Sequence, residues 1–536
     1  ISTPSREKYN HFSFINPYLA NPGAAGRPGS LVFAGNIAGS GNPASFGKPY
    51  PETTDLHNFA PRFGFAYALT PKTVVRGGYG LFFQPLSYPG WNSGVSGGRD
   101  GFNTNVVLSP SNGGITPATL FSKGFTGAQY QAPPFFDLSF DNGKQPGVYR
   151  EFNKGHLPNS QQWNLTVERQ FTNEFYMTVA YVGNKGTHLI SGLASPNVLN
   201  PSLLSMGNPL YDTFKTGQTS LDGVSIPYAG WVEQLTNGQC QPTVAQALVP
   251  YPQFCGNLTA LNENAGYSTF NSLQVKAERR MSHGLMFLGS YTWSKFLSSG
   301  ADQQFGKFGT VGLNNYAGLI SPYQRQRNKA LDAQDVPHTL SLTTLYDLPM
   351  GKGHRFMGSS GGVSDKLFSG WAVNAIFRAQ SGIPFFFQSS QCNIPSQFGM
   401  GCLPGVLPGA NPFVTSIADY NPKNGPLLNR ASFENGTAGG VFSFYPGVGS
   451  RVTNIRQSPF TSMNFVLEKN TRITEKTVFQ IRAEFFNLFN LHFFAQGTTW
   501  GQGGAFVTDV GNPLFGTWTG GVTTPRNIQL AARFSF

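Results

Sequence analysis

The sequence PRNIQLAARFSF, residues 525–536, ends the chain and gives the first indication of its fold class. Apolar residues occupy every second position, namely Ile528, Leu530, Ala532, Phe534 and Phe536. A period of two indicates a β-strand with one apolar face. Such a segment is typical of the closing strand of a transmembrane β-barrel, whose apolar side faces lipid and whose polar side faces the lumen. An amphipathic strand of a soluble β-sandwich is the alternative that these residues leave open.

The composition favours the barrel. Only 12% of the residues are charged, about half the usual share of soluble domains, while 14% are aromatic and 65 are Gly. No apolar run approaches the roughly 18 residues that a membrane-spanning helix needs. Together these features indicate an outer-membrane barrel with long loops, and a secreted fibrous or adhesive β-protein is the main rival.

The net charge of +12 does not indicate a nucleic-acid partner, because the basic residues are scattered and no binding motif accompanies them. Contact with anionic lipid head groups, or a basic lumen that favours anionic solutes, explains the charge better.

Further alternating segments fall into five pairs. They are residues 62–69 with 74–83, 163–170 with 175–182, 272–280 with 285–294, 338–346 with 371–380, and 462–469 with 477–486. Strands near residues 9–14 and 31–34 would precede them. With the closing strand, the sequence predicts 12 or 13 strands.

The connections have two lengths. Within a pair the turn is a few residues, with residues 348–370 as the longer exception, whereas long connections separate the pairs. Short turns on one rim and long loops on the other are how outer-membrane barrels are built. We therefore predict an all-β antiparallel transmembrane barrel with short periplasmic turns and long extracellular loops.

Charged residues on single strand faces are expected to point into a wet lumen. They are Lys276, Glu278, Arg280, Arg482 and Glu484. Charges buried on a strand face need water or partners, and a barrel lumen supplies both. An interior charge ladder explains Arg482 and Glu484 better than a catalytic acid/base pair does.

The four cysteines form two close pairs, Cys240 with Cys255 and Cys392 with Cys402, in loop-like segments. Two disulfides are expected in an oxidising compartment. Metal ligation is the weaker alternative, since no His lies beside either pair.

Other patterns give little support for catalysis. Residues 94–98 match G-x-S-x-G but lack the strand before and the helix after that a nucleophile elbow needs. No metalloprotease, phosphate-loop or C-x-x-C motif occurs. A charge-rich segment before His338 is interpreted as a solvated loop; it contains Arg325, Arg327, Asp332 and Asp335. We expect no enzyme activity, cofactor or metal.

Several islands of sequence resemble TonB-dependent outer-membrane receptors, and the Oar-like branch in particular, in which a carboxypeptidase-regulatory-like domain precedes the plug. They are GRPGSLVFAG (residues 26–35), HNFAPRFGFAYALTPKTVVRGGYGLFF (57–83), LPNSQQWNLTVERQF (157–171), YVGNKGTHL (181–189), YSTFNSLQVKAERRMSHGLMFLGSYTWSK (267–295) and FQIRAEFFNLFN (479–490). The resemblance implies a 22-stranded barrel, of which residues 1–536 would be the C-terminal portion, with the plug domain and the N-terminal strands absent. It also implies that Leu530, Phe534 and Phe536 carry the signal read by the barrel-insertion machinery.

The function implied is import of a bulky solute across the bacterial outer membrane by the full-length parent. The solute would be an iron chelate, an oligosaccharide or a peptide, and TonB would act through the missing N-terminal part. Outer-membrane lipid and lipopolysaccharide would surround the barrel. A passive porin-like channel and a surface adhesin or structural β-protein are the alternatives.

Overall fold

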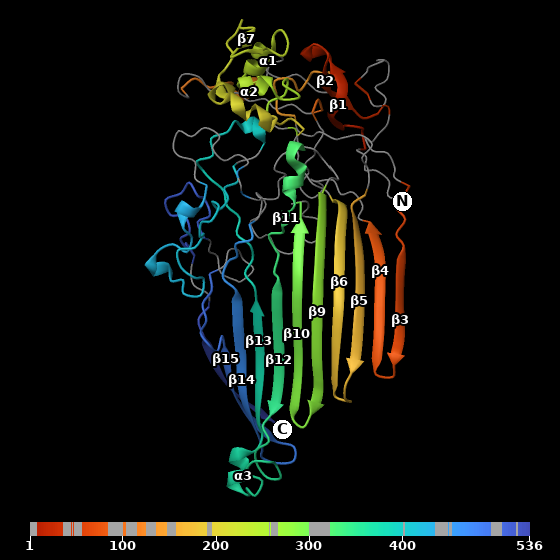
Figure 1. The fold of residues 1–536 in the computed structure, drawn as a ribbon, viewed down its shortest axis with the longest axis vertical. Helices are drawn as coiled ribbons and strands as arrows, with labels where there is room; N and C mark the ends of the chain where they lie inside the picture. Colours follow the sequence, from red (N-terminus) through yellow and green to blue (C-terminus); the bar gives the residue numbers. More distant parts are fainter. Residues whose placement is uncertain are drawn as a thin grey trace.

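The computed structural model describes residues 8–35, 44–45, 47, 56–83, 100–102, 115–124, 136–146, 157–189, 196–238, 240–256, 258, 266–299, 322–399, 402–434, 447, 449, 453–494, 506–520 and 524–536. Long strands lie side by side in one sheet, and a body of loops and short helices stands at one end of it (Figure 1). In this part of the chain, no helix combines the length and the apolar character that crossing a membrane would require.

A 12-stranded antiparallel sheet dominates the structure. Its long strands are β3 (Arg62–Thr70), β4 (Thr73–Phe83), β5 (Asn159–Gln170), β6 (Phe175–Leu189), β9 (Gly266–Ser282), β10 (Leu285–Ser298), β12 (His338–Asp347), β13 (Trp371–Gln380), β14 (Phe460–Arg472), β15 (Val478–Phe486) and β16 (Asn527–Ser535). The short β11 (Ala330–Leu331) pairs with the end of β10. From β3 to β16 each long strand pairs with the next one along the chain, and no pairing of β3 with β16 occurs among the described residues.

The five strand pairs and the closing strand predicted from the alternation are confirmed. β13 has the predicted bounds, whereas β6 and β9 are longer than predicted. Their mutual pairing continues to Leu189 and Gly266. Backbone hydrogen bonding thus extends these two strands beyond the residues whose side chains alternate.

Two strands are present near the positions predicted before residue 62, but they do not belong to the large sheet, so their assignment to the barrel is wrong. β1 (Ser13–Asn21) and β2 (Arg27–Phe33) form a separate two-stranded sheet at the long-loop end (Figure 1). Phe14 and Ile15, adjacent residues that point to opposite sides of β1, are both buried. A membrane strand would leave its lipid side uncovered, whereas this hairpin packs against loop residues such as Phe254.

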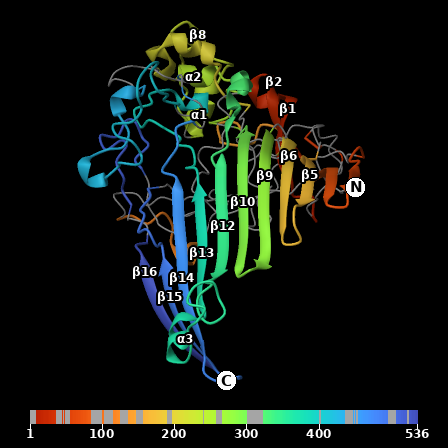
Figure 2. The same cartoon turned by 60° about the horizontal axis from the view of Figure 1, so that its bottom comes forward.

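The connections within pairs lie at one end of the sheet, and the described parts of the connections between pairs lie at the other (Figures 1 and 2). Residues 348–370, which join β12 to β13, are the one long connection within a pair. They contain the helix α3 (Val363–Phe368) and project beyond the ends of the two strands. The predicted segregation of short turns and long loops is therefore confirmed.

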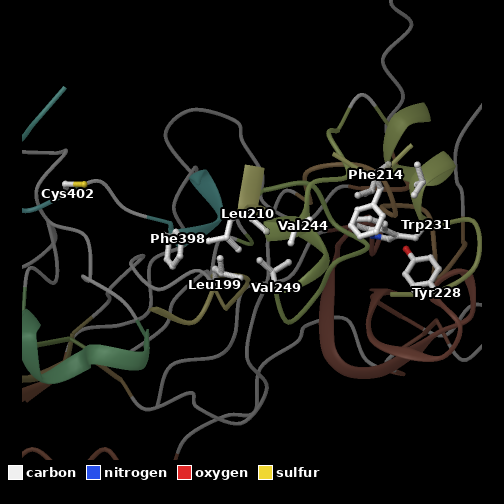
Figure 3. Packing of buried hydrophobic residues seen from close by; sticks show 13 residues of the cluster. Leu199, Leu210, Phe214, Tyr228, Trp231, Val244, Val249, Phe398 and Cys402 are labelled. Carbon is white, nitrogen blue, oxygen red and sulfur yellow. The ribbon is translucent and has the colours of Figure 1, made fainter. Parts of the chain in front are cut away.

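The described parts of the long connections fold together with the β1–β2 hairpin into a body that we call the cap. One hydrophobic cluster of the cap surrounds α1 (Trp231–Asn237) and α2 (Val244–Ala247). Trp231 is fully buried, packs edge-on against Phe214 and donates its indole N–H to the carbonyl of Pro252 at 2.8 Å. Phe398 and Cys402 join the cluster from the β13–β14 connection, across Leu199 and Leu210 (Figure 3).

A second cluster joins the β13–β14 and β15–β16 connections. Phe385 lies 5.4 Å from Phe506 between ring centroids, and Phe433 lies 5.0 Å from Phe515. All four rings are buried. Each aromatic ring removes a large apolar area from water, so these contacts hold two connections together that are remote in sequence.

The structure pairs Cys240 with Cys255 and Cys392 with Cys402, with Cα atoms 5.8 Å and 5.4 Å apart. All four side chains lie in or against the cluster around α1. The cysteines joined in the cap are thus the same pairs that the sequence placed close together. Among the described residues no cysteine is free.

A carboxyl group is buried where the β1–β2 hairpin meets the rest of the cap. Asp141 is 3% exposed, and its Oδ2 has no hydrogen-bond partner. Burial, reinforced by the nearby Asp100 and opposed by Lys144, raises the pKa of Asp141 to about 8. The backbone around it is fixed by Gly143 N–H donating to the Gln253 carbonyl at 2.8 Å.

Replacing Cys240 and Cys255 together by Ser is expected to destabilise the cap. Closing a loop of this length contributes about 3 kcal/mol by restricting the unfolded chain. Amide hydrogen exchange in α1 and α2 should accelerate, while exchange in β9 and β10 stays unchanged. Equal protection of α1 in the variant and the parent protein would show that the disulfide contributes nothing to the cap.

The buried Asp141 predicts a cap that weakens as the pH rises. In the unfolded chain this carboxyl loses its proton near pH 4, whereas in the fold it keeps the proton up to about pH 8. The folded state therefore binds more protons between these values, and stability falls across that window. Hydrogen exchange corrected for intrinsic rates should show this loss around Gly143, and Asp141→Asn should abolish it. If exchange around Gly143 depends on pH in the same way in the parent protein and in the Asp141→Asn variant, Asp141 is not the group that weakens the cap.

Candidate solute-facing surface

Strand register gathers polar side chains into continuous rows on one face of the sheet, which we call the polar face. One row crosses seven strands from β5 to β14, and each member is opposite the next. It consists of Glu168, Thr178, Lys276, Ser290, Ser341, Arg378 and Ser462. Neighbours in such a row have Cβ atoms about 5 Å apart, so they form one polar band.

β6 and β9 carry a charged group on the polar face. The Nζ of Lys276 lies 3.1 Å from a carboxylate oxygen of Glu278, and the Tyr176 hydroxyl donates to the same carboxylate. The Lys276 ammonium and the Arg280 guanidinium also lie 5.8 Å and 6.0 Å from the centroid of the Tyr176 ring. These contacts fix the directions of the Lys276 and Glu278 side chains.

A second polar group lies on β14 and β15. The side-chain amide of Gln480 donates to Glu468 at 2.9 Å and to Asn470 at 3.0 Å. Arg482 Nε lies 3.3 Å from Glu484 Oε1, and Arg482 is directly opposite Glu468 in the register. The sequence pattern places Gln480, Arg482 and Glu484 on one strand face, whereas Glu468 joins them only through the pairing of two strands.

The structure does not bring the two groups together, since β10, β12 and β13 lie between β9 and β14. Their ion pairs are partly exposed, with side-chain exposures of 47% for Lys276 and 41% for Arg482. Exposed ion pairs contribute little to stability. The polar face is thus a wall of partly exposed polar and charged side chains. In the described ranges no set of three or more His, Cys, Asp or Glu side chains could hold a metal ion.

The opposite face of the sheet is apolar and uncovered. One of its rows pairs Leu165, Tyr181, Leu273 and Trp293 across β5, β6, β9 and β10. Those four residues are between 37% and 56% exposed, and on β16 Leu530 is 76% exposed and Phe534 56%. An apolar face of this extent suits contact with lipid chains. Leu288 and Ile376 are apolar exceptions on the polar face.

The charge-rich segment before His338 is not a solvated loop throughout, which corrects the expectation. Asp335 is 1% exposed and forms an ion pair with Arg456, whose Nη1 also donates to the Asp335 carbonyl at 2.8 Å. The Phe296 N–H donates to the Asp335 carboxylate at 2.6 Å. Asp335 therefore ties the end of β10 to the β13–β14 connection. Its partner is 121 residues away, so no local pattern could reveal it.

Leu530, Phe534 and Phe536 lie on or next to β16, an edge of the sheet. Phe536 is 96% exposed. The G-x-S-x-G match at residues 94–98 lies outside the described residues.

Comparison with known proteins identifies the family. A family model described as "Outer membrane beta barrel domain" matches residues 1–529. No curated protein matches the chain.

Several solved structures are similar to this chain, at low sequence identity and low TM-score. The outer membrane transporter YddB from Escherichia coli is 8% identical with a TM-score of 0.38, over 89% of this chain and 40% of YddB. The ferripyoverdine receptor of the Pseudomonas aeruginosa outer membrane is 10% identical with a TM-score of 0.34, over 95% of this chain and 35% of the receptor. The ferric-catecholate import receptor Fiu from Escherichia coli K12 is 12% identical with a TM-score of 0.33, over 95% of this chain and 40% of Fiu.

This chain spans 35% to 40% of the length of those three proteins. Such similarity does not assign a solute or a mechanism. The match that extends over nearly all of the sequence does assign the family and the location in the outer membrane: the chain belongs to the outer membrane beta barrel domain family.

Proposed function

We propose that the chain supplies the C-terminal barrel wall and the outer loops of a TonB-dependent receptor that imports a bulky solute. The observation that carries the proposal is the ordered cap at the end of the polar face where the long connections gather. Short turns leave the other end of that face without an equivalent body, apart from residues 348–370. A passive pore has no need of a disulfide-stapled cap built from several connections.

Under this proposal each part of the structure has a task. The cap is the extracellular surface that meets the solute, and the polar face lines the route inward. Lys276, Glu278, Arg280, Arg482 and Glu484 keep that lining charged and hydrated. The apolar face holds the wall in lipid, and the short turns lie in the periplasm.

Energised import requires parts beyond this wall. The resemblance of the sequence islands to TonB-dependent receptors supports a plug and a TonB-contacting segment upstream in the complete protein. The barrel-insertion machinery is the proposed partner of the closing strand. The solute class is an iron chelate, an oligosaccharide or a peptide, and the proposed role includes no catalysis.

Uptake by cells that carry the complete protein tests the proposal. Cells given labelled ferric chelates, oligosaccharides or peptides should accumulate one class, and removal of TonB should reduce uptake to the level of cells lacking the receptor. The rings of Phe387 and Phe433 pack together in the second cluster of the cap, with centroids 4.6 Å apart. Replacing both residues by Gly loosens the cap and should impair uptake at an unchanged amount of folded barrel. Uptake that persists without TonB would indicate a passive channel instead.

The closing strand predicts an assembly defect. Phe536→Ala or deletion of Phe536 should lower the amount of folded, heat-modifiable protein in outer membranes severalfold, because the insertion machinery loses its terminal aromatic contact. Ser535→Ala, on the opposite face of the same strand, is the matched control and should assemble normally. Equal assembly of the Phe536 and Ser535 variants would remove Phe536 from the insertion signal.

A further inference from the structure

Residues 348–370, which we call the foot, form the longest connection at the short-turn end and are unlike the tight turns beside them. Five of their apolar side chains are uncovered: Phe356 is 55% exposed, Met357 46%, Val363 75%, Leu367 60% and Phe368 37%. A connection that needed only to reverse the chain would require none of these residues. The foot therefore presents an apolar surface whose partner has to be identified.

The foot is folded, so its apolar side chains are held in place. The Asp365 carboxylate accepts hydrogen bonds from the Lys352 N–H at 2.7 Å and the Ser360 hydroxyl at 3.4 Å. Gly351 N–H donates to the Phe356 carbonyl at 2.9 Å. Asp365 thus ties α3 to the preceding residues of the foot. Val363 and Leu367, which are one turn apart, lie together on another side of the helix.

Hydrogen bonds place α3 on the apolar side of the sheet. The Trp371 indole N–H donates to the Leu367 carbonyl at 3.0 Å, and the Lys469 ammonium donates to the Ser369 carbonyl. Trp371 and Lys469 are opposite each other, in a row that continues to Ile481. That row alternates with the polar row of Glu468 and Arg482, so it belongs to the apolar face. The foot consequently continues the lipid-facing surface at its rim.

The charge of the foot suits anionic head groups. Lys352, Arg355 and Lys366 are exposed basic residues, and Asp365 is the single acidic residue of the foot. Trp371, whose ring lies 5.9 Å from the Lys469 ammonium, has the amphipathic character favoured at a membrane–water interface. Apolar side chains that enter the head-group boundary together with basic residues beside them are the features of an interfacial helix.

We propose that the foot lies in the phospholipid head-group layer at the short-turn rim and binds anionic phospholipid there. Val363, Leu367 and Phe356 enter the boundary of the acyl chains, while Lys352, Arg355 and Lys366 contact phosphate groups. The placement of this layer in the periplasmic leaflet rests on the orientation given under the proposed function. The lipid contact itself depends only on the apolar face and on α3.

Site-specific quenching tests the contact. Leu367→Cys in the complete protein, labelled with an environment-sensitive fluorophore and reconstituted in phosphatidylethanolamine–phosphatidylglycerol vesicles, should be quenched severalfold more by doxyl-labelled lipid than Leu514→Cys. Leu514 is the matched control, because it is a leucine of the cap with the same 60% exposure. Val363→Cys gives a second, independent position. Folding of each variant is checked by heat modifiability.

Charge reversal tests the head-group preference. Lys352→Glu with Lys366→Glu should reduce quenching at position 367 in vesicles with phosphatidylglycerol, and reduce it less in purely zwitterionic vesicles. Lys423→Glu, an exposed lysine of the cap, should have no effect. A label at position 367 as exposed to water as the one at position 514 would overturn the proposal. A label at position 367 that is shielded from water in native membranes but not in vesicles would also overturn the proposal, in favour of a periplasmic protein partner. Neither readout involves solute uptake, so failure here leaves the proposed import untouched.

Discussion

Pairing of backbone hydrogen-bonding groups is the constraint on which the rest of this structure depends. In the hydrocarbon layer no water is present to satisfy an N–H or a carbonyl, so each strand must find a neighbour on both sides. From β4 to β15 every long strand has two neighbours. The edges β3 and β16 have one neighbour each among the described residues, and the same constraint requires a further pairing for both within the membrane.

Continuous pairing also fixes the side-chain chemistry of the two faces. A slip of one residue between any two strands would exchange the lipid-facing and water-facing sets. The register keeps the lipid-facing and water-facing side chains apart. The polar Lys276 is opposite Ser290 and Thr178, whereas its apolar neighbour Val275 is opposite Tyr291 and Val179. The charged groups on β9 and β15 are consequences of this separation and need no common site to explain them.

The sheet could be predicted from the sequence because its information is local. Alternation within one strand, such as Gln480 to Phe485, and a short turn before the next strand are visible in a few residues. The same rule failed for β1 and β2, because a hairpin buried on both sides also contains apolar residues at alternate positions. Sequence shows the period of a strand, whereas only the tertiary structure shows what covers each face.

The cap could not be predicted because its contacts join distant segments. Phe398 packs against the cluster around Trp231, and Asp335 bonds to Arg456 across 121 residues. The cysteine spacing was the one local sign of order in these connections.

These distant contacts also determine how the cap can move. The cluster around α1 includes the β6–β9 and β13–β14 connections, and the aromatic cluster of Phe385 and Phe506 adds the β15–β16 connection. Packed interfaces of this kind rearrange between discrete states rather than deforming gradually. Under the proposed function, a solute that displaces one connection must therefore displace the others with it or break a buried aromatic contact. Access to the polar face would then depend on the cap as a whole, and substitutions far from the solute would alter it.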